Sequence, residues 1–321
     1  MKTAKALLRA PEMVTLLLLA ASIIAGSLMS PYFLDGEYLL EKTSEMIPVA
    51  FLALGMTFVI SSGNIDLSVA SGSVLTAVAC AIAFENGLPM PAVVVLALLL
   101  GSALGLFNGL LVTRLGIPSL VATLGTLALY RGLAQVLVGE RAIRGFPSWF
   151  SSVDYVKFGI VPLPLILLIT AAILAHFLLQ RTTFGRRVYA IGTNESASFY
   201  SGINTGRTKL LIFMLSGLCM GIAALLLMSM RPVDYKQLRG GELLAITAVV
   251  LGGTSIFGGR GRIPGTLLAV LLLVCVTSAL GVANVRVENR LAVIGALLIG
   301  AVLLTGLTGR AFGKARKSRG V

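Results

Sequence analysis

The segment FGRRVYAIGTNESASFYSGINTGRTK, residues 184–209, is a long polar and basic interruption in the second half of a very apolar chain. One apolar run precedes it over residues 163–179, and another follows it over residues 210–230. Runs of about 17 to 25 apolar residues have the length that a helix needs to cross the hydrocarbon core of a membrane. The segment is therefore predicted to be a loop between two membrane-spanning helices, and the same organisation extends over the rest of the chain.

The composition points to a membrane protein. Of the 321 residues, 57% are hydrophobic and only 12% are charged, with a mean hydropathy of +0.96. Soluble domains average about 25% charged residues. The apolar runs are too long, and alternate too little, for an outer-membrane barrel. The sequence predicts an all-α, polytopic helical bundle that forms a single transmembrane domain over residues 1–321.

The apolar runs predict ten membrane spans. They cover residues 13–29, 46–62, 65–84, 92–112, 119–138, 162–180, 210–230, 243–257, 264–283 and 291–307. The third span follows a break at Gly63 and Asn64, and the eighth is short and ends in GGRGR at residues 258–262. Either could re-enter the membrane without crossing it. Eight full spans with two half-helices place both termini on the same side, as ten spans do.

The distribution of charge predicts the orientation. Sixteen of the 26 Lys and Arg residues fall in the two termini and in every second loop, including residues 181–209. The other loops hold nine basic residues and ten acids. Cytoplasmic loops carry such an excess of Lys and Arg, so both termini are expected in the cytoplasm. This excess also explains the net charge of +13 without a nucleic-acid partner.

The chain contains none of the motifs that would make it an enzyme. It has no G-x-x-x-x-G-K-[ST], no HExxH and no CxxC. Its three cysteines lie inside apolar runs, where cysteine acts as a small packing residue. The single histidine, His176, lies near the end of an apolar run and is expected to pack at the interface. We therefore expect no catalytic residue, metal or cofactor in this chain, and any energy for transport must come from ions or from a partner.

A short helix is predicted inside the loop at residues 181–209. Asn194 is suited to be its N-cap, Glu195 would lie in the first turn near the positive end of the helix dipole, and Gly202 would end it. A short capped helix on the cytoplasmic side is a surface that another protein can bind. The residue types alone fit an ordinary loop of the positive-inside kind equally well.

Two charged residues lie within the predicted membrane region. Asp66, at the break between Asn64 and Ser68, is either a site residue or proton carrier, or a capping group for the next helix. Arg131 lies within the fifth span, where it either faces protein and water or extends toward the outer interface.

Small and polar residues recur in the spans. Gly101, Gly105 and Gly109 are spaced by four residues on the fourth span, and Gly217 and Gly221 repeat the spacing on the seventh. Small residues at this spacing let helices pack closely in membranes, so a packing role is predicted. The side chains of three further residues could line a polar path or bond to backbone carbonyls: Asn108, Thr123 and Thr126.

Four stretches carry a resemblance to a known family. They are GMTFVISSGNIDLSVASGSVL at 55–75, FNGLLVTRLGIPSLVATLGTLALYRG at 107–132, FGRRVYAIGTNESASFYSGI at 184–203 and ITAVVLGGTSIFGGRGRIPGTLLAV at 246–270. Together they resemble the permease subunit of bacterial ATP-binding-cassette (ABC) importers of the ribose, xylose, arabinose, galactoside and rhamnose type. Many members have a second glycine before the Ile-Asp pair, where this chain has Asn64. In this the chain resembles the subset that imports rhamnose or a furanosyl signalling molecule of the autoinducer type.

The resemblance implies an inner-membrane complex in which two permease subunits, identical or different, form a pore. Two ATPase domains, which bind ATP and Mg²⁺, would attach on the cytoplasmic side, and a periplasmic sugar-binding protein would dock on the outer loops at 139–161 and 231–242. The ATPase contact would fall on Gly185, Arg186, Ala190, Ile191, Gly192, Asn194, Glu195, Ala197, Ser201 and Gly202. The translocation pathway would involve Asn64, Asp66, Ser68, Asn108, Thr123, Thr126 and Arg131. The alternatives are an ion-coupled secondary transporter of small polar solutes and a channel or structural membrane protein.

Overall fold

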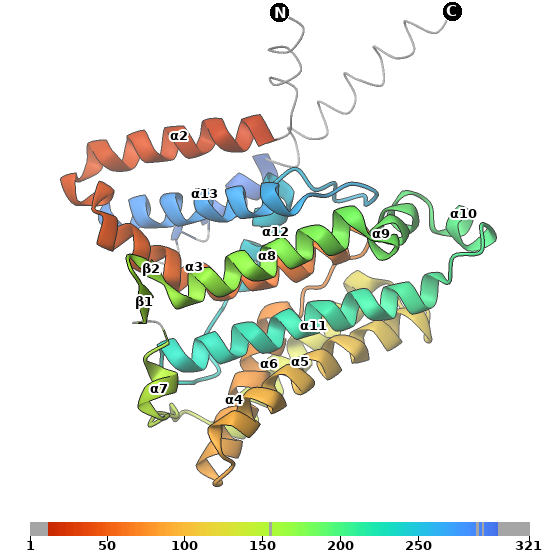
Figure 1. Ribbon diagram of the computed structural model, residues 1–321, viewed down its shortest axis with the longest axis horizontal. Helices are drawn as coiled ribbons and strands as arrows, with labels where there is room; N and C mark the ends of the chain where they lie inside the picture. The colour runs from red at the N-terminus through yellow and green to blue at the C-terminus, as the bar shows by residue number, and fades with distance from the viewer. Residues whose placement is uncertain (1–11, 154–155, 287–288, 291, 301–321) are drawn as a thin grey trace, which may run out of the picture.

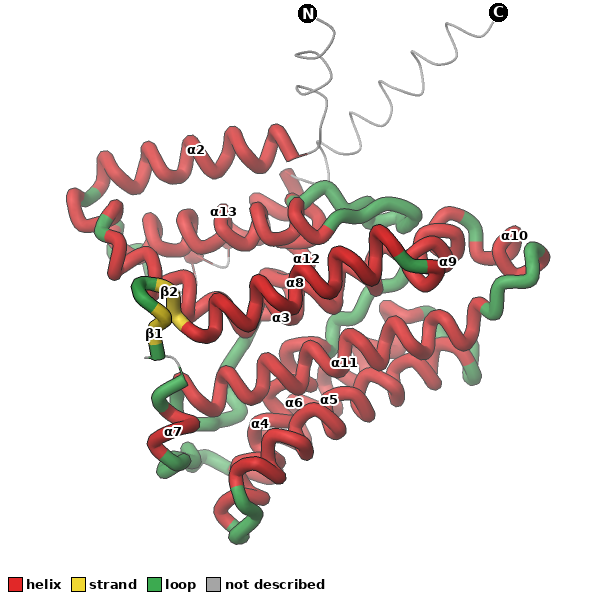
Figure 2. Tube along the Cα trace, in the orientation of Figure 1, coloured by secondary structure: helices red, strands yellow, loops and turns green. Residues whose placement is uncertain are grey.

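The computed structural model describes residues 12–153, 156–286, 289–290 and 292–300, and most of these are helical (Figures 1 and 2). The longer helices are α2 (Glu12–Met29), α3 (Gly36–Ser61), α4 (Val69–Glu85), α5 (Met90–Thr113), α6 (Ser119–Val138), α8 (Leu163–Arg181), α11 (Thr205–Met230) and α13 (Ile263–Val282). The shorter ones are η1 (Pro31–Leu34), α7 (Ser148–Ser151), α9 (Thr183–Thr193), α10 (Glu195–Tyr200) and α12 (Gly241–Leu251). Strands β1 (Lys157–Phe158) and β2 (Val161–Pro162) form a small antiparallel hairpin. The prediction of an all-α membrane protein is confirmed.

Six described helices are long and apolar enough to cross a membrane: α3, α5, α6, α8, α11 and α13. Helix α12 has 11 residues, which at 1.5 Å per residue extend about 16 Å, roughly half of a 30 Å hydrocarbon core. It therefore has the length of a half-helix, as the sequence allowed for the eighth span. Helix α4 has 17 residues and is close to full length. The tenth predicted span extends beyond the described residues, so the total of ten spans stays a prediction.

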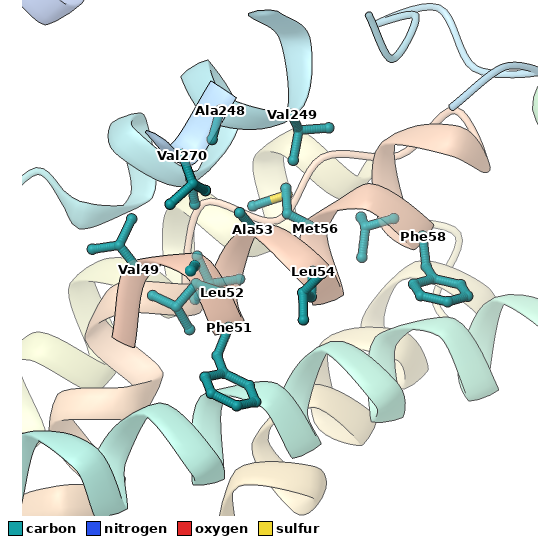
Figure 3. Close-up of a cluster of buried hydrophobic side chains, with 14 of the residues drawn as sticks. Val49, Phe51, Leu52, Ala53, Leu54, Met56, Phe58, Ala248, Val249 and Val270 are labelled. Atoms are coloured by element: carbon teal, nitrogen blue, oxygen red, sulfur yellow. The ribbon is translucent and has the colours of Figure 1, made fainter. Parts of the chain in front are cut away.

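Helix α3 lies at the centre of the bundle. Its second half is buried without a break from Ile47 to Ser61, and it packs against α8, α11, α12 and α13. Figure 3 shows the result: Phe51 and Phe58 point to one side of α3, and Met56 points to the opposite side, where Val249 of α12 also lies. A helix that is apolar on all sides must be enclosed by other helices, which is the position that α3 takes.

Helices α4, α5, α6 and α11 form a second packed group. Helix α4 packs against α5, α6 and α11 around a separate apolar cluster that includes Val74, Tyr130 and Met228. Helix α11 also contacts α3, so it joins the two groups (Figure 1). The hairpin and α7 lie at one end of the bundle, and α9 and α10 lie at the other.

Glycines allow α5 and α11 to approach each other at backbone distance. A Cβ atom on Gly101 would meet the backbone of Gly217 and Gly221, and one on Gly105 would meet the backbone of Phe213 and Gly217. Gly109 lies at the end of the same line of contact, against Leu210 and Phe213. We call this glycine contact between the two helices the α5–α11 seam. Because lipid gives little hydrophobic drive for helices to associate, this close backbone packing is the main attraction between them.

We expect Gly105→Ala to destabilise the protein, because the added methyl group meets α11 backbone that cannot rotate away. Overpacking of this kind costs about 1–3 kcal/mol. Gly132→Ala, on α6, is the matched control, since nothing lies within 4 Å of its added Cβ. Thermal unfolding of both variants in the same detergent checks the expectation. Equal unfolding temperatures would show that close packing at the α5–α11 seam does not contribute to the stability of the protein.

Candidate functional site

The loop between α8 and α11 forms two helices, α9 and α10. Thr182 Oγ1 accepts a hydrogen bond from the Gly185 amide and caps α9. Asn194 Oδ1 accepts from the Ala197 amide at 2.9 Å and caps α10, as the sequence predicted. Gly202 ends that segment with a φ of +84°, in the left-handed region that glycine tolerates best.

Helix α9 was not predicted, although its sequence contains a signal of an amphipathic helix. Val188 and Ile191 are buried, whereas Arg186 and Arg187 are exposed, so the helix is amphipathic and lies along the end of the bundle. The run is only 11 residues long and contains two glycines, which obscure the 3.6-residue period. The predicted coupling loop is therefore two consecutive helices with different environments.

The ten residues predicted to contact an ATPase divide by exposure. Gly185 and Ile191 are buried, Ala190 and Gly192 are half-buried, and the exposed ones are Arg186, Asn194, Glu195, Ala197, Ser201 and Gly202. Glu195 is held by Lys209, whose Nζ lies 2.6 Å from a carboxylate oxygen. Two further residues of α10, Phe199 and Tyr200, are aromatic and are 63% and 87% exposed, and no sequence motif predicted them. Exposed aromatics of this kind are frequent anchors of protein interfaces.

Gly192, at the end of α9, lies directly against two interruptions in the membrane helices. A Cβ atom at this position would meet the carbonyl of Ser61, where α3 ends, and the amide of Gly259 in the loop at 252–262. The Gly259 amide donates to the Ser61 carbonyl at 2.9 Å, and Gly63 also lies against Gly192. We call this contact of residues 61–63, 192–193 and 257–259 the glycine junction. It is built of backbone on all three sides.

A second contact holds α9 to the same loop. The Tyr189 hydroxyl donates to the Gly261 carbonyl at 2.7 Å. Gln180 Nε2, at the end of α8, donates to the Tyr189 oxygen at 2.9 Å and to the Gly261 carbonyl at 3.2 Å. Burial raises the pKa of Tyr189 to about 12, so its hydroxyl remains a donor at physiological pH.

The break between α3 and α4 is a buried polar cluster. Asp66 Oδ1 accepts from the amide and the hydroxyl of Ser68, at 3.0 and 2.7 Å, and Asn108 Nδ2 of α5 donates to the Ser68 hydroxyl at 2.7 Å. From α6, Thr123 binds both the Ile65 carbonyl and the Leu67 amide. Asp66 thus bonds to the residue that precedes α4, and no described side chain caps that helix. Both roles considered for Asp66 stay predictions. Asp66 Oδ2 has no hydrogen-bond partner among the described residues.

The residues predicted for a translocation pathway are mostly found together at this break. Asn64, Asp66, Ser68, Asn108 and Thr123 are buried there, and Thr126 follows one turn along α6, donating to the Thr123 carbonyl. Arg131 lies apart from them. Its Nη1 donates to the carbonyls of Tyr235 and Gln237, at 2.9 and 2.7 Å, in the loop before α12. The guanidinium thus faces protein.

A family profile described as "Branched-chain amino acid transport system / permease component" matches residues 38–302. The chain belongs to this permease family. Autoinducer 2 import system permease protein LsrD of Salmonella typhimurium is 38% identical over 293 residues, which cover 89% of this chain and 88% of the relative. LsrD of Escherichia coli K12 is 38% identical over 301 residues, 91% of each chain. No solved structure matches the chain at a significant level.

These similarities identify the chain as a permease component of an ABC importer for sugar-like solutes, a multi-pass protein of the inner membrane. They favour this function over that of an ion-coupled transporter. The relatives are transport subunits and not enzymes. The family description mentions amino acids, whereas the relatives' names mention autoinducer 2, so membership of the permease family alone does not define the solute.

We expect Arg131→Ala to reduce uptake by the permease, because it frees the Tyr235 and Gln237 carbonyls and releases the loop before α12. A hydrogen bond to a charged group contributes about 1.5–3 kcal/mol. Lys157→Ala, on the exposed hairpin, removes a cation without removing such bonds and is the control. Uptake of solute into cells that express equal amounts of each variant measures the difference, and equal losses would contradict a specific role of Arg131.

Proposed function

We propose that this permease passes a furanosyl signalling molecule of the autoinducer-2 type into the cytoplasm. The carrying observation is the 38% identity to autoinducer 2 import permeases over about nine-tenths of both chains. The Asn64-Ile65-Asp66 sequence, in place of a second glycine, supports the same subset of the family. Rhamnose import is the second candidate, because the same local feature resembles both groups.

The exposed side of α10, with the adjoining part of α9, is proposed to bind the ATPase. It presents Phe199 and Tyr200 together, with ring centroids 5.8 Å apart, beside the Glu195–Lys209 ion pair. Aromatic anchors with charged residues at the margin are typical of protein interfaces. ATP and Mg²⁺ would be bound by that partner and not by this chain.

The glycine junction is proposed to transmit motion from the ATPase to the membrane helices. Gly192 touches the end of α3 and the loop that joins α12 to α13 with no side chain between them. Closely packed backbone has no rotamers that could absorb a displacement. A shift of α9 would therefore move both helix interruptions together. The polar residues of the break, which are bonded to one another in this structure, would line the inner end of the pathway when the break opens.

The end of the molecule opposite α9 and α10 is proposed to bind the periplasmic binding protein, through the loop after α6 and the loop before α12. Its two loops are joined, since Ile143 and Val233 exchange backbone hydrogen bonds of 2.9 Å. Glu140 accepts from Tyr235 at 2.8 Å and from Lys236 at 2.9 Å across the same contact. The joined loops form one platform, and a second permease subunit, identical or homologous, would complete the pore.

The substrate is tested by uptake. We expect cells that express the complete importer to accumulate labelled autoinducer-2, and to lose this uptake when the permease is deleted. Excess unlabelled rhamnose or ribose should compete poorly. Rhamnose accumulation with no autoinducer-2 uptake would make the second candidate correct, and uptake that persists without an ATPase would contradict both.

We expect Gly192→Ala to separate ATP hydrolysis from transport, because the methyl group must displace the Ser61 carbonyl or the Gly259 amide. Gly206→Ala, in the first turn of α11, is the matched control, since its nearest contact is at 3.9 Å. The purified complex in vesicles reports both ATP hydrolysis and solute uptake. The expected result is a loss of uptake per ATP for Gly192→Ala, with binding of the ATPase unchanged. Coupled transport at the normal ratio would contradict transmission through the junction.

A further inference from the structure

The loop between α12 and α13 displays one aromatic side chain. Phe257 is 89% exposed, whereas its neighbour Ile256 packs against the apolar core that includes α3. Figure 1 places this loop at the same end of the bundle as α9 and α10. Phe257 takes part in the glycine junction through its backbone carbonyl, which lies near Gly63. Its exposed ring has no role in that junction.

The backbone holds Phe257 in a fixed position. The Gly258 amide donates to the Ser255 carbonyl at 3.0 Å. This bond closes a turn that has Ile256 and Phe257 at its two central positions. The Ser255 amide also donates to the Arg260 carbonyl at 3.1 Å, which closes the base of the loop. A side chain presented from such an ordered turn has less conformational freedom to lose when it binds a partner.

The turn lies beside the surface of α10 that is proposed to bind the ATPase. A Cβ atom on Gly258 would lie 2.6 Å from the Gly192 carbonyl, and one on Gly259 would meet Thr193, the last residue of α9. Helix α10 begins two residues further along the chain and carries the exposed aromatic pair. Because the turn rests directly on the end of α9, the Phe257 ring and the exposed side of α10 belong to one end of the molecule.

The neighbours of the Phe257 ring are polar. Arg260 in the same loop is exposed, and so are Arg187 and Thr193 of α9. An aromatic side chain with a polar margin is the arrangement found at protein interfaces. A surface that faces lipid tails has an apolar margin instead, as on α8, where the adjacent Ile173 and Leu174 are 64% and 65% exposed. The surroundings of Phe257 therefore favour a protein partner over lipid.

We propose that the turn at residues 255–258 is a second docking point for the ATPase, and that the Phe257 ring enters an apolar pocket of that partner. The inference rests on the proposed binding of the ATPase at α10. A partner that holds both α10 and this turn would contact two sides of the glycine junction, α9 and the loop between α12 and α13. Its movement would then act on that loop directly as well as through α9.

Photo-crosslinking in the assembled complex tests the proposal. The photoreactive amino acid p-benzoylphenylalanine replaces Phe257, Tyr200 or Phe158 in separate variants, and the products formed on illumination are identified by mass spectrometry. Phe158 is the control, because it is 63% exposed on the hairpin at the other end of the bundle. We expect products with the ATPase from positions 257 and 200 and none from position 158.

The outcomes separate this inference from the proposed function. A product with the ATPase from position 200 alone would overturn the second docking point and leave the proposed role of α10 intact. So would a product that joins position 257 to lipid or to the second permease subunit. The absence of ATPase products from both positions would overturn the docking point and the role of α10 together.

Truncation of the ring measures its contribution. We expect Phe257→Ala to weaken binding of the purified ATPase to the permease in lipid nanodiscs about thirtyfold, the loss typical of an interface anchor. Phe158→Ala is the matched control and should leave this affinity unchanged. Because Phe257 is exposed, the Ala variant should unfold at the wild-type temperature. An unchanged affinity of Phe257→Ala for the ATPase would contradict the proposal.

Discussion

Backbone-to-backbone contact, made possible by glycine, is the constraint on which this structure depends. At the α5–α11 seam it brings two membrane helices together where lipid gives little hydrophobic drive. At the junction it places Gly192 against the end of α3 and the loop before α13. The first contact fixes the packing of α5 against α11, and the second ties α9 to the core of the bundle. In both places a single added methyl group has no space.

The interrupted helices create a second requirement, because the backbone groups at a helix end need partners inside the membrane. The break after α3 meets it with side chains from other helices: Thr123 binds the Ile65 carbonyl and the Leu67 amide, and Ser119 accepts from the Ile65 amide. Asp66 satisfies the Ser68 amide from within the break. The polarity of this buried region follows from the backbone it supports, and a pathway for a polar solute can use the same groups.

Much of this organisation could be predicted from local sequence. The length of the apolar runs predicts the helices, and Asn194 and Gly202 predict the ends of α10, because each signal depends on neighbouring residues only. The meeting of Gly63, Gly192 and Gly259 could not be predicted, since nothing in a glycine shows which distant backbone will approach it. The partners of Arg131 were equally hidden. They are carbonyl oxygens, which every residue has, so no side chain in the loop at 235–237 identifies them.

The position of α3 explains why the junction is suited to transmit motion. This helix is enclosed by α8, α11, α12 and α13, so its end cannot move without displacing the surrounding core. The Gly259 amide binds the last carbonyl of that same helix, and Tyr189 holds the neighbouring Gly261. A displacement of α9 therefore acts on the most confined helix in the bundle and on the loop that follows the half-helix α12. Because close-packed cores shift between discrete arrangements and do not deform gradually, the movement proposed for α9 would favour one arrangement of both interruptions over another.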